Sequence, residues 1–320
     1  MPHHSIVADV GGTNTRVAIA RDGQVLPDSI RKFANAGHDS LTDILSAYRN
    51  SHDTVMFEQA AVAIAGPVRD GEGRLTNLDW SIDCPSLTQA TGAPDAHVLN
   101  DLQAQAHAVG SLDPAKVEII RSGQNASPEA AHLVVGIGTG FNSAVAYHTS
   151  GGRLVPPAES GHATLPVSTA DQLAFAQYLR SRFSHAAIED ALSGRGLGHC
   201  HDWLCHRAGQ PIGVKSAQVF ADAEAGNDKA KEAINLFSCI LGTVLGDLAL
   251  TTLPFGGIYL VGGMSRAIAP WLDKTGFEAA WYDKGRFGPF LDQFPIRLVT
   301  DDYAALTGCA SFLEEFRTAH

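Results

Sequence analysis

The chain has little charge, few cysteines and few basic residues. Only 18% of its 320 residues are charged, whereas 45% belong to the apolar set A, V, I, L, M, F, W, Y and C. This composition excludes a disordered chain and supplies apolar material for two domains of roughly 150 residues each. Lysine and arginine number 23 against 34 aspartates and glutamates, so the formal net charge is −11. An acidic surface disfavours nucleic acid as the main partner, but it does not exclude a small anion held by local amides and a metal.

Targeting and membrane-spanning patterns are also missing. The opening residues, MPHHS, contain no basic region followed by an apolar run, so no secretory leader is predicted. The uncharged stretch at 233–246 is interrupted by polar residues, and we expect no membrane span. The five cysteines are odd in number and scattered, which is typical of reduced thiols. We therefore expect a cytoplasmic location.

Apolar runs and helical periodicity predict a mixed α/β fold. A buried strand at 5–10 is followed by a glycine turn and a second strand at 16–20, and the same pattern recurs at 132–137 and 143–147. Two strands joined so tightly must be antiparallel. The recurrence indicates an internal duplication, with chance similarity of two short segments as the alternative. Further strands are expected at 60–65, 96–100, 257–261 and 295–299, and helices at 39–49, 101–109, 228–250 and 303–317.

Glycine-rich turns follow three of these strands. Residues 9–14 read DVGGTN, residues 136–140 read GIGTG, and Gly262 and Gly263 follow the strand at 257–261. Such turns let the backbone approach a ligand and point its N–H groups at an anion. An aspartate before the first turn suits Mg²⁺, directly or through water. A plain hairpin turn explains the first segment equally well, but three turns together favour a nucleoside triphosphate.

Two other nucleotide motifs are excluded. A P-loop needs a Gly-x4-Gly-Lys-Ser/Thr run, which the sequence does not contain. A dinucleotide fingerprint starting at Gly136 needs Gly or Ala at position 141, which is Phe141, and one starting at Gly138 needs it at position 143, which is Ser143.

Polar side chains suited to a sugar are scattered over the chain. Asn100 and Asp101 stand where a strand is predicted to end and a helix to begin, which is where open α/β sheets bind ligands. Glu159, His162 and Glu189 lie in predicted loops or loop ends. Carboxylates, amides and imidazoles bind hydroxyls, which both donate and accept. Taken singly, Asp101 is better explained as a helix cap and the others as solvated loop residues.

Taken together and in order, the motifs resemble the bacterial glucokinase family of the actin–hexokinase–chaperone ATPase superfamily. The matching segments are 9–14, 63–68 (AIAGPV), 76–80 (TNLDW), 99–101 (LND), 136–140, 159–162 (ESGH), 192–194 (LSG), 257–263 and 283–287 (DKGRF). Each is weak alone, whereas the ordered set spans nearly the whole chain. The zinc-binding cysteine motif of the related repressor/kinase family is not found.

The resemblance implies a two-domain actin/hexokinase-like (ribonuclease H-like) α/β fold with an interdomain cleft. It implies a small domain at 1–110 plus 301–320 and a large domain at 111–300. By this resemblance, Asp101 corresponds to the family's catalytic base. The residues that resemble its sugar ligands are Asn100, Asp101, Glu159, His162 and Glu189. The ATP-binding candidates are Ala8, Asp9, Val10, Gly11, Gly12, Thr13, Gly138, Thr139, Gly140, Gly262 and Gly263, with Asp9 holding Mg²⁺ through water.

The implied activity is transfer of the γ-phosphoryl of ATP to the 6-hydroxyl of glucose, giving glucose 6-phosphate for glycolysis. The resemblance also implies a homodimer. A kinase of another hexose, or a non-catalytic sugar or nucleotide sensor, are the alternatives. Because the first strand is expected to start at about Ser5, we expect no DNA-binding segment in front of it, which disfavours a sensor that acts as a repressor.

Two segments depart from this picture. The family usually carries Leu-Gly after the second turn, where this chain has Phe141 and Asn142, which leaves the phosphoryl donor open. The segment 199–206 holds three histidines and two cysteines. It could bind zinc, but we expect an amphipathic helix with its cysteines inward and its histidines in water.

Overall fold

The computed structural model describes residues 3–75 and 78–319, with only the backbone of Ala319. The chain forms two compact units. Unit 1 comprises Met1–Lys116, Ala144–Pro157 and Asp301–His320, and unit 2 comprises Val117–Ser143 and Ala158–Thr300. The predicted division into a domain of 1–110 plus 301–320 and a domain of 111–300 stays a prediction.

Unit 1 is built on a mixed sheet with the strand order β3-β2-β1-β5-β9, and β4 pairs with β2. The strands are β1 (His4–Val10), β2 (Asn14–Arg21), β3 (Gln24–Val25), β4 (Arg31–Ala34), β5 (Gln59–Ile64) and β9 (Asp95–Asn100). β1 is antiparallel to β2 but parallel to β5, and β5 is parallel to β9. The carboxyl ends of β1, β5 and β9 therefore meet at one edge of the sheet.

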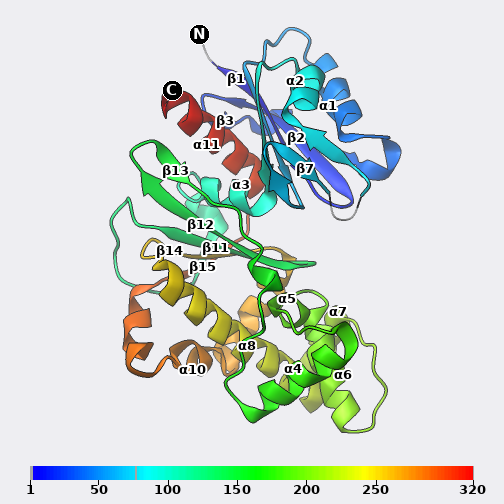
Figure 1. Cartoon of the computed structure of the whole chain (residues 1–320), viewed down its shortest axis with the longest axis vertical. Helices are drawn as coiled ribbons and strands as arrows, with labels where there is room; N and C mark the ends of the chain where they lie inside the picture. The colour runs from blue at the N-terminus through cyan, green and yellow to red at the C-terminus, as the bar shows by residue number, and fades with distance from the viewer. Residues whose placement is uncertain (1–2, 76–77, 320) are drawn as a thin grey trace. The chain divides into compact units, whose positions relative to one another are not determined.

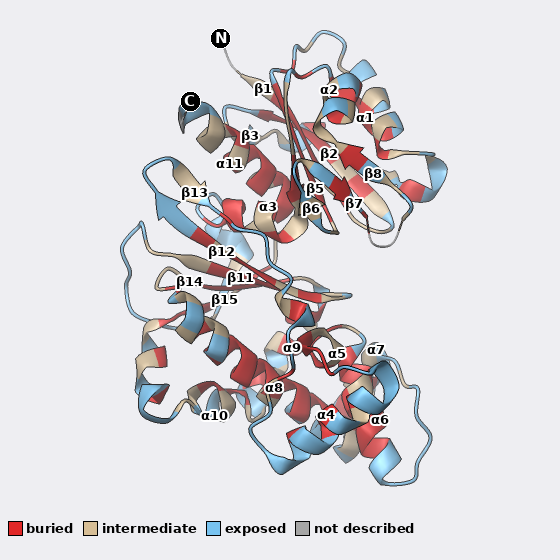
Figure 2. Ribbon diagram, in the orientation of Figure 1, coloured by how far each residue is buried: buried red, intermediate tan, exposed pale blue. Residues whose placement is uncertain are grey.

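Helices cover both faces of this sheet (Figure 1). They are α1 (Leu41–Asn50), α2 (Cys84–Thr91), α3 (Asp101–Ala108) and α11 (Ala304–Ala319). Successive strand residues point to opposite faces, so Ile6 and Ala8 pack toward α1 and α2, whereas Val7 packs toward α3 and α11. Because both faces are covered, the central strands β1 and β5 are mostly apolar and mostly buried (Figure 2). A small separate sheet holds β6 (Val68–Arg69), β7 (Glu72–Arg74) and β8 (Ser81–Asp83).

The second large sheet has the order β10-β15-β14-β11-β12-β13. Its strands are β10 (Val117–Arg121), β11 (His132–Ile137), β12 (Phe141–Thr149), β13 (Gly152–Leu154), β14 (Gly257–Val261) and β15 (Ile296–Val299). β11, β14 and β15 run parallel, and β10 is antiparallel to β15. β12 begins in unit 2, while its residues from Ala144 onward and β13 belong to unit 1.

The rest of unit 2 is mainly helical. Its helices are α4 (Ala170–Phe183), α5 (Ile188–Ala191), α6 (Gly196–Arg207), α7 (Ser216–Glu224), α8 (Asp228–Thr252), α9 (Gly263–Ile268) and α10 (Phe277–Tyr282). α8 packs against α6, α7 and α10. α8 contains the stretch 233–246 and, judged by length and composition alone, is long and apolar enough to cross a membrane. However, 72% of its most apolar window is buried inside the protein, and core helices of globular proteins pass the same test.

The structure confirms the mixed α/β prediction and the repeated strand–turn–strand pattern, which forms β1–β2 and β11–β12. All five cysteines lie among the described residues and are free thiols. The prediction for 199–206 is partly wrong. The cysteines are buried as expected, but His201 is buried too, with its ring against the Cys205 sulfur. α6 is contacted by α4, α5, α7 and α8, so it is more enclosed than its periodicity alone predicts.

Candidate active site

Parallel strand register brings the first glycine turn and the start of α3 to the same edge of unit 1. Val10 on β1 pairs with Ile64 on β5, and Ile64 pairs with Asn100 on β9. Neighbouring strands lie about 4.8 Å apart, so the turn after Val10 and the Asn100–Asp101 pair are separated by roughly 10 Å. We call this group, Asp9–Thr13 with Asn100 and Asp101, the Asp101 edge.

Asn100, rather than Asp101, caps α3. Its side-chain oxygen accepts from the backbone N of Leu102 at 3.0 Å, and the side chain of Gln103 accepts from the backbone N of Asn100 at 3.1 Å. This is a capping box. The amide of Asn100 also donates to the carbonyl of Gly66 at 2.9 Å. Asp101 is therefore the first residue of a helix whose N-terminus is capped. The positive partial charge at a helix N-terminus stabilises a carboxylate.

Asp9 is paired with a cation on the neighbouring strand. Its Oδ2 lies 3.1 Å from Nη1 of Arg16, which is its register partner on β2. Burial raises the pKa of Asp9, and the charge and hydrogen bond of Arg16 oppose that rise. Of the two carboxylate oxygens of Asp9, only Oδ2 accepts a hydrogen bond from a described residue. Oδ1 is therefore available to a metal-bound water. The magnesium prediction fits this geometry but stays a prediction.

The far end of α3 is held by a partly buried ionic group that sequence reasoning missed. Nη1 of Arg153 donates to the carbonyl of His107 at 2.7 Å and to Glu315 at 2.9 Å. Glu315 also contacts the ring of His107 at 3.2 Å. Nearer the start of the helix, the amide of Gln103 donates to the carbonyl of Val155 at 2.8 Å. These contacts fix the helix that begins with Asp101.

Glu315→Gln is expected to lower the free energy of unfolding by roughly 1–2 kcal/mol at pH 7. Burial raises the pKa of Glu315, but the hydrogen bond from His107 and the charge of Arg153 outweigh it and the net shift is downward. A lowered folded-state pKa contributes stability above the unfolded value, and that contribution is lost as the pH falls through the folded value. Chemical denaturation at pH 7 and pH 4 should therefore give a smaller difference from wild type at pH 4. An equal difference at both values would contradict this account.

The second glycine turn is supported by its neighbours in unit 2. The N of Gly138 donates to the carbonyl of Gly140 at 2.9 Å, and the N of Gly194 donates to the carbonyl of Gly138 at 2.6 Å. Gly262 lies so close that a Cβ there would come within 2.5 Å of the carbonyl of Ile137. At Gly138 and Gly263, by contrast, a Cβ would meet no described atom within 4 Å. The turn therefore has one supported side and one open side, as a ligand cradle requires.

Glu189 belongs to this turn. Its Oε2 accepts from the backbone N of Phe141 at 3.0 Å, and its Oε1 accepts from Arg195 at 3.2 Å. A Cβ on Gly140 would lie 2.4 Å from Oε2 of Glu189. Sequence reasoning placed Glu189 only among the sugar ligands and missed that it braces the turn. Its role as a sugar ligand stays a prediction.

The segment that carries Glu159 and His162 packs beside Glu189. A short 3-10 helix, η4 (Ser160–His162), follows Glu159. A Cβ on Gly161 would lie 2.0 Å from the carbonyl of Phe141 and 3.5 Å from Cβ of Glu189. Unit 2 thus brings together three predicted sugar ligands and the second glycine turn. Glu159 and His162 are exposed, so they are available to a ligand. We call Gly138–Gly140, Glu159, His162 and Glu189 the glycine-turn site.

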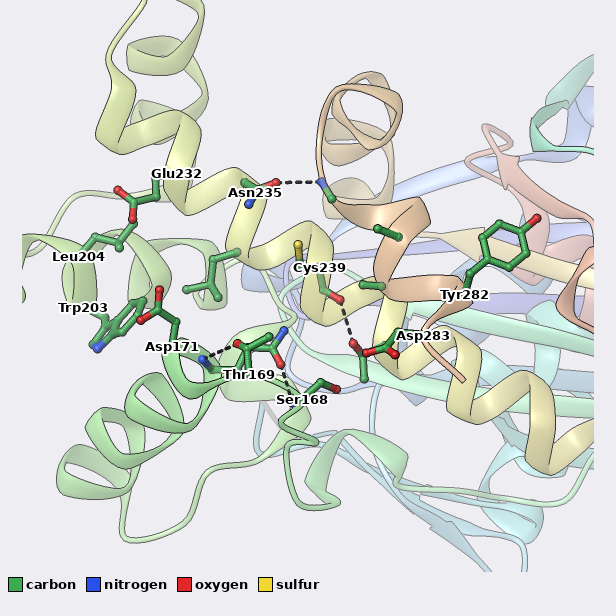
Figure 3. Close-up of a pocket in the computed structure, with 16 residues that line it drawn as sticks. Ser168, Thr169, Asp171, Trp203, Leu204, Glu232, Asn235, Cys239, Tyr282 and Asp283 are labelled. Atoms are coloured by element: carbon green, nitrogen blue, oxygen red, sulfur yellow. Dashed lines mark hydrogen bonds between the residues drawn. The ribbon is translucent and has the colours of Figure 1, made fainter. Parts of the chain in front are cut away.

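Two alternatives for ligand binding in unit 2 are weaker. A hollow of about 590 Å³ lies among α4, α6, α8 and α10 (Figure 3). Its lining includes Asp171, Glu232 and Asp283 but no lysine or arginine, so it is unsuited to a triphosphate. In the described part of the chain, no group of three or more His, Cys, Asp or Glu side chains is placed to hold a metal ion, so the structure offers no support for zinc at 199–206.

Comparison with known proteins shows the family of the chain. The family model described as Glucokinase matches residues 6–316. This chain belongs to the glucokinase family. The glucokinase of Rhizobium etli (strain CIAT 652) is 33% identical over 315 residues, covering 98% of this chain and 92% of that protein. The glucokinase of Nitrobacter hamburgensis is 34% identical over 312 residues, covering 96% of each.

Solved structures support the two-domain actin/hexokinase-like fold. The glucokinase of an Antarctic psychrotroph is 29% identical, with a TM-score of 0.88 over 97% of this chain and 98% of that chain. A ROK family glucokinase from Streptomyces griseus, solved with glucose and AMPPNP, is 18% identical, with a TM-score of 0.62 over 97% of this chain and 98% of that chain; it shares the fold. Thr76 and Asn77, the first two residues of the motif at 76–80, lie outside the described residues.

Proposed function

We propose that this glucokinase-family enzyme transfers the γ-phosphoryl of ATP to the 6-hydroxyl of D-glucose, giving glucose 6-phosphate for glycolysis. The observation that carries the proposal is the strand register of unit 1. It sets Asp101 beside the glycine turn of β1, within the spacing of two strands. Family membership supports the substrate class, because the named relatives are glucokinases.

Asp101 is the proposed general base. Oxygen 6 of glucose forms a bond to the γ-phosphorus as the bond to the β–γ bridging oxygen breaks, ADP leaves, and the hydroxyl proton passes to the carboxylate of Asp101. Such transition states are loose, so positioning and charge stabilisation dominate. A carboxylate at the start of a fixed helix suits this role because its position is set by the Asn100 cap.

The two glycine turns are the proposed phosphate contacts. Ala8–Thr13 would hold phosphate oxygens through backbone N–H groups, and Gly138–Gly140 with Gly262 and Gly263 would do the same from unit 2. Asp9 would hold Mg²⁺ through water, and the metal would neutralise phosphate charge. Asn100, Glu159, His162 and Glu189 would bind the sugar hydroxyls and aim the 6-hydroxyl.

A coupled assay of glucose 6-phosphate formation tests the proposal directly. Initial rates are measured with ATP and Mg²⁺ across glucose, fructose, mannose and N-acetylglucosamine. We expect the highest kcat/KM with glucose. A higher value with another hexose would make the enzyme a kinase of that sugar. Sugar binding without turnover would make it a sensor on the same fold.

Glu159→Ala is expected to raise the glucose KM by at least roughly tenfold and to leave the ATP KM within about twofold. The side chain is exposed beside η4 and, as a proposed sugar ligand, accepts from a hydroxyl. Both constants come from initial rates with the second substrate saturating. Unchanged constants would remove Glu159 from the sugar ligands.

The predicted homodimer, which rests on the family resemblance, and the predicted cytoplasmic location, for which the scattered cysteines were one ground, remain part of the proposal. Light scattering of the purified protein at assay concentration measures the mass directly. A mass near 33.8 kDa would indicate a monomer and contradict the dimer.

A further inference from the structure

Asn142 binds both segments through which the chain passes between the units. The chain leaves unit 2 after Ser143 and returns to it at Ala158. Within unit 2, Nδ2 of Asn142 donates to the carbonyl of Ala158 at 2.7 Å. Oδ1 of the same side chain accepts from the backbone N of Ser160 at 3.0 Å. One planar amide therefore joins the outgoing strand to the returning segment.

These hydrogen bonds flank Glu159. The carbonyl of Ala158 belongs to the peptide group before Glu159, and the N of Ser160 belongs to the peptide group after it. Glu159 itself has φ −126° and ψ 53°, outside regular helix or strand geometry, and its carbonyl accepts from the N of His162 at 3.2 Å. An exposed residue in such a segment has considerable conformational freedom unless its backbone is restrained. Asn142 supplies that restraint on both sides.

The other end of the link is rigid. Asn142 is the second residue of β12, directly after Phe141, whose N is bound by Glu189 and whose side chain is buried. Oδ1 of Asn142 also accepts from the N of Ser143 at 2.8 Å and from the hydroxyl of Ser160 at 3.2 Å. The side chain therefore ties Glu159 to the strand that continues from the second glycine turn.

We propose that Asn142 is a positioning residue for sugar binding, which fixes Glu159 at a set distance from the glycine turn. The proposal rests on the proposed function, in which Glu159 binds a sugar hydroxyl. The contacts that carry it are those on either side of Glu159. A glycine at position 142 would have no side chain to form these hydrogen bonds.

Asn142→Ala is expected to raise the glucose KM roughly tenfold, because two hydrogen bonds that restrain Glu159 are lost. The ATP KM and kcat should stay within about twofold of wild type, since the turn itself keeps its bonds to Glu189 and Gly194. Ser143→Ala is the matched control. It removes the 2.8 Å hydroxyl contact between Ser143 and Ser160 but leaves both flanks of Glu159 bound. Its glucose KM should stay close to wild type.

A double-mutant cycle with Glu159→Ala separates this inference from the proposed function. If Asn142 acts through Glu159, adding Asn142→Ala to the Glu159→Ala enzyme changes the glucose KM by less than about twofold. If the two increases multiply, or if the ATP KM rises equally, the inference is wrong. If Glu159→Ala alone leaves the glucose KM unchanged, the assignment of Glu159 fails instead.

A second variant guards against misfolding. Asn142→Gly removes the whole side chain, and its melting temperature is compared with that of Asn142→Ala before any kinetics. Asn142→Gly should show the same rise in glucose KM, because it lacks the same amide. A wild-type glucose KM in either folded variant would overturn the proposal.

Discussion

Asp101→Asn is expected to lower kcat for glucose phosphorylation by roughly two to four orders of magnitude, with the glucose KM changed by less than about fivefold. Asparagine has nearly the same size and keeps an oxygen that accepts from the N of Leu102, as Asp101 does at 2.9 Å. Its amide accepts no proton at neutral pH, so the base is removed while the helix start is preserved. Asp101→Ala should show a similar loss of kcat and a somewhat weaker affinity for glucose.

The measurement is steady-state kinetics with both substrates varied. Asp95→Asn is the matched control, because Asp95 is the first residue of β9, at the end opposite to Asn100, which Asp101 follows. Its carboxylate contacts Gln59 and His97 rather than the Asp101 edge. The control should keep kcat within about twofold of wild type. A kcat for Asp101→Asn within threefold of wild type would exclude Asp101 as the base.

Local sequence patterns were sufficient for most of the regular structure. The apolar run at Gly257–Val261 predicted a strand, and the helical periodicity within Asp228–Thr252 predicted a helix. In both cases the type of element depends on the segment's own residues. The turn glycines marked where β1 and β11 end. Strand β10 was missed because it is an edge strand with Ile119 71% exposed, so it lacks the buried alternation that identifies a strand.

The candidate site was predictable only where its residues follow a strand directly. Asn100 and Asp101 come after an apolar run, and their position at the sheet edge follows from topology alone. The bond between Glu189 and the N of Phe141 joins positions 48 residues apart, and that between Arg153 and Glu315 joins positions 162 apart. No local periodicity encodes which distant side chain will meet a given backbone group.

The cap at α3 shows why residue type alone misassigns roles. Asn and Asp are both good N-caps, and the sequence favoured Asp101 for that role when taken singly. The structure gives the cap to Asn100, one residue earlier. This shift by one residue changes the role of both side chains. It places the carboxylate of Asp101 inside the first turn, where it is not needed to cap the start of the helix.

Gly308→Ala is expected to lower the melting temperature by roughly 5 °C or more. A Cβ on Gly308 of α11 would lie 1.7 Å from the carbonyl oxygen of Ala104 and 2.5 Å from its carbonyl carbon. Those are backbone atoms of α3, so rotation of a side chain cannot relieve the contact. Alanine has the higher helix propensity by about 1 kcal/mol, but overpacking against the backbone typically costs 1–3 kcal/mol and occasionally more. We therefore expect destabilisation.

Gly37→Ala provides the control for this substitution. Gly37 lies in η2 (Asn35–Gly37), and a Cβ there would meet no described atom within 4 Å. Its melting temperature, followed by circular dichroism, should stay within about 1–2 °C of wild type. A wild-type melting temperature for Gly308→Ala would mean that α11 and α3 separate without cost, which would contradict the close packing described for unit 1.

The same variant connects packing to catalysis. Because α3 begins with Asp101, separating α11 from α3 moves the proposed base relative to the first glycine turn. Assayed well below its melting temperature, Gly308→Ala should therefore lose kcat more than it loses affinity for glucose, since misplacing a reacting group by about 1 Å can cost two orders of magnitude in rate. A lowered melting temperature with unchanged kcat would show that the helix recovers its position in the folded enzyme and that Gly308 serves stability alone.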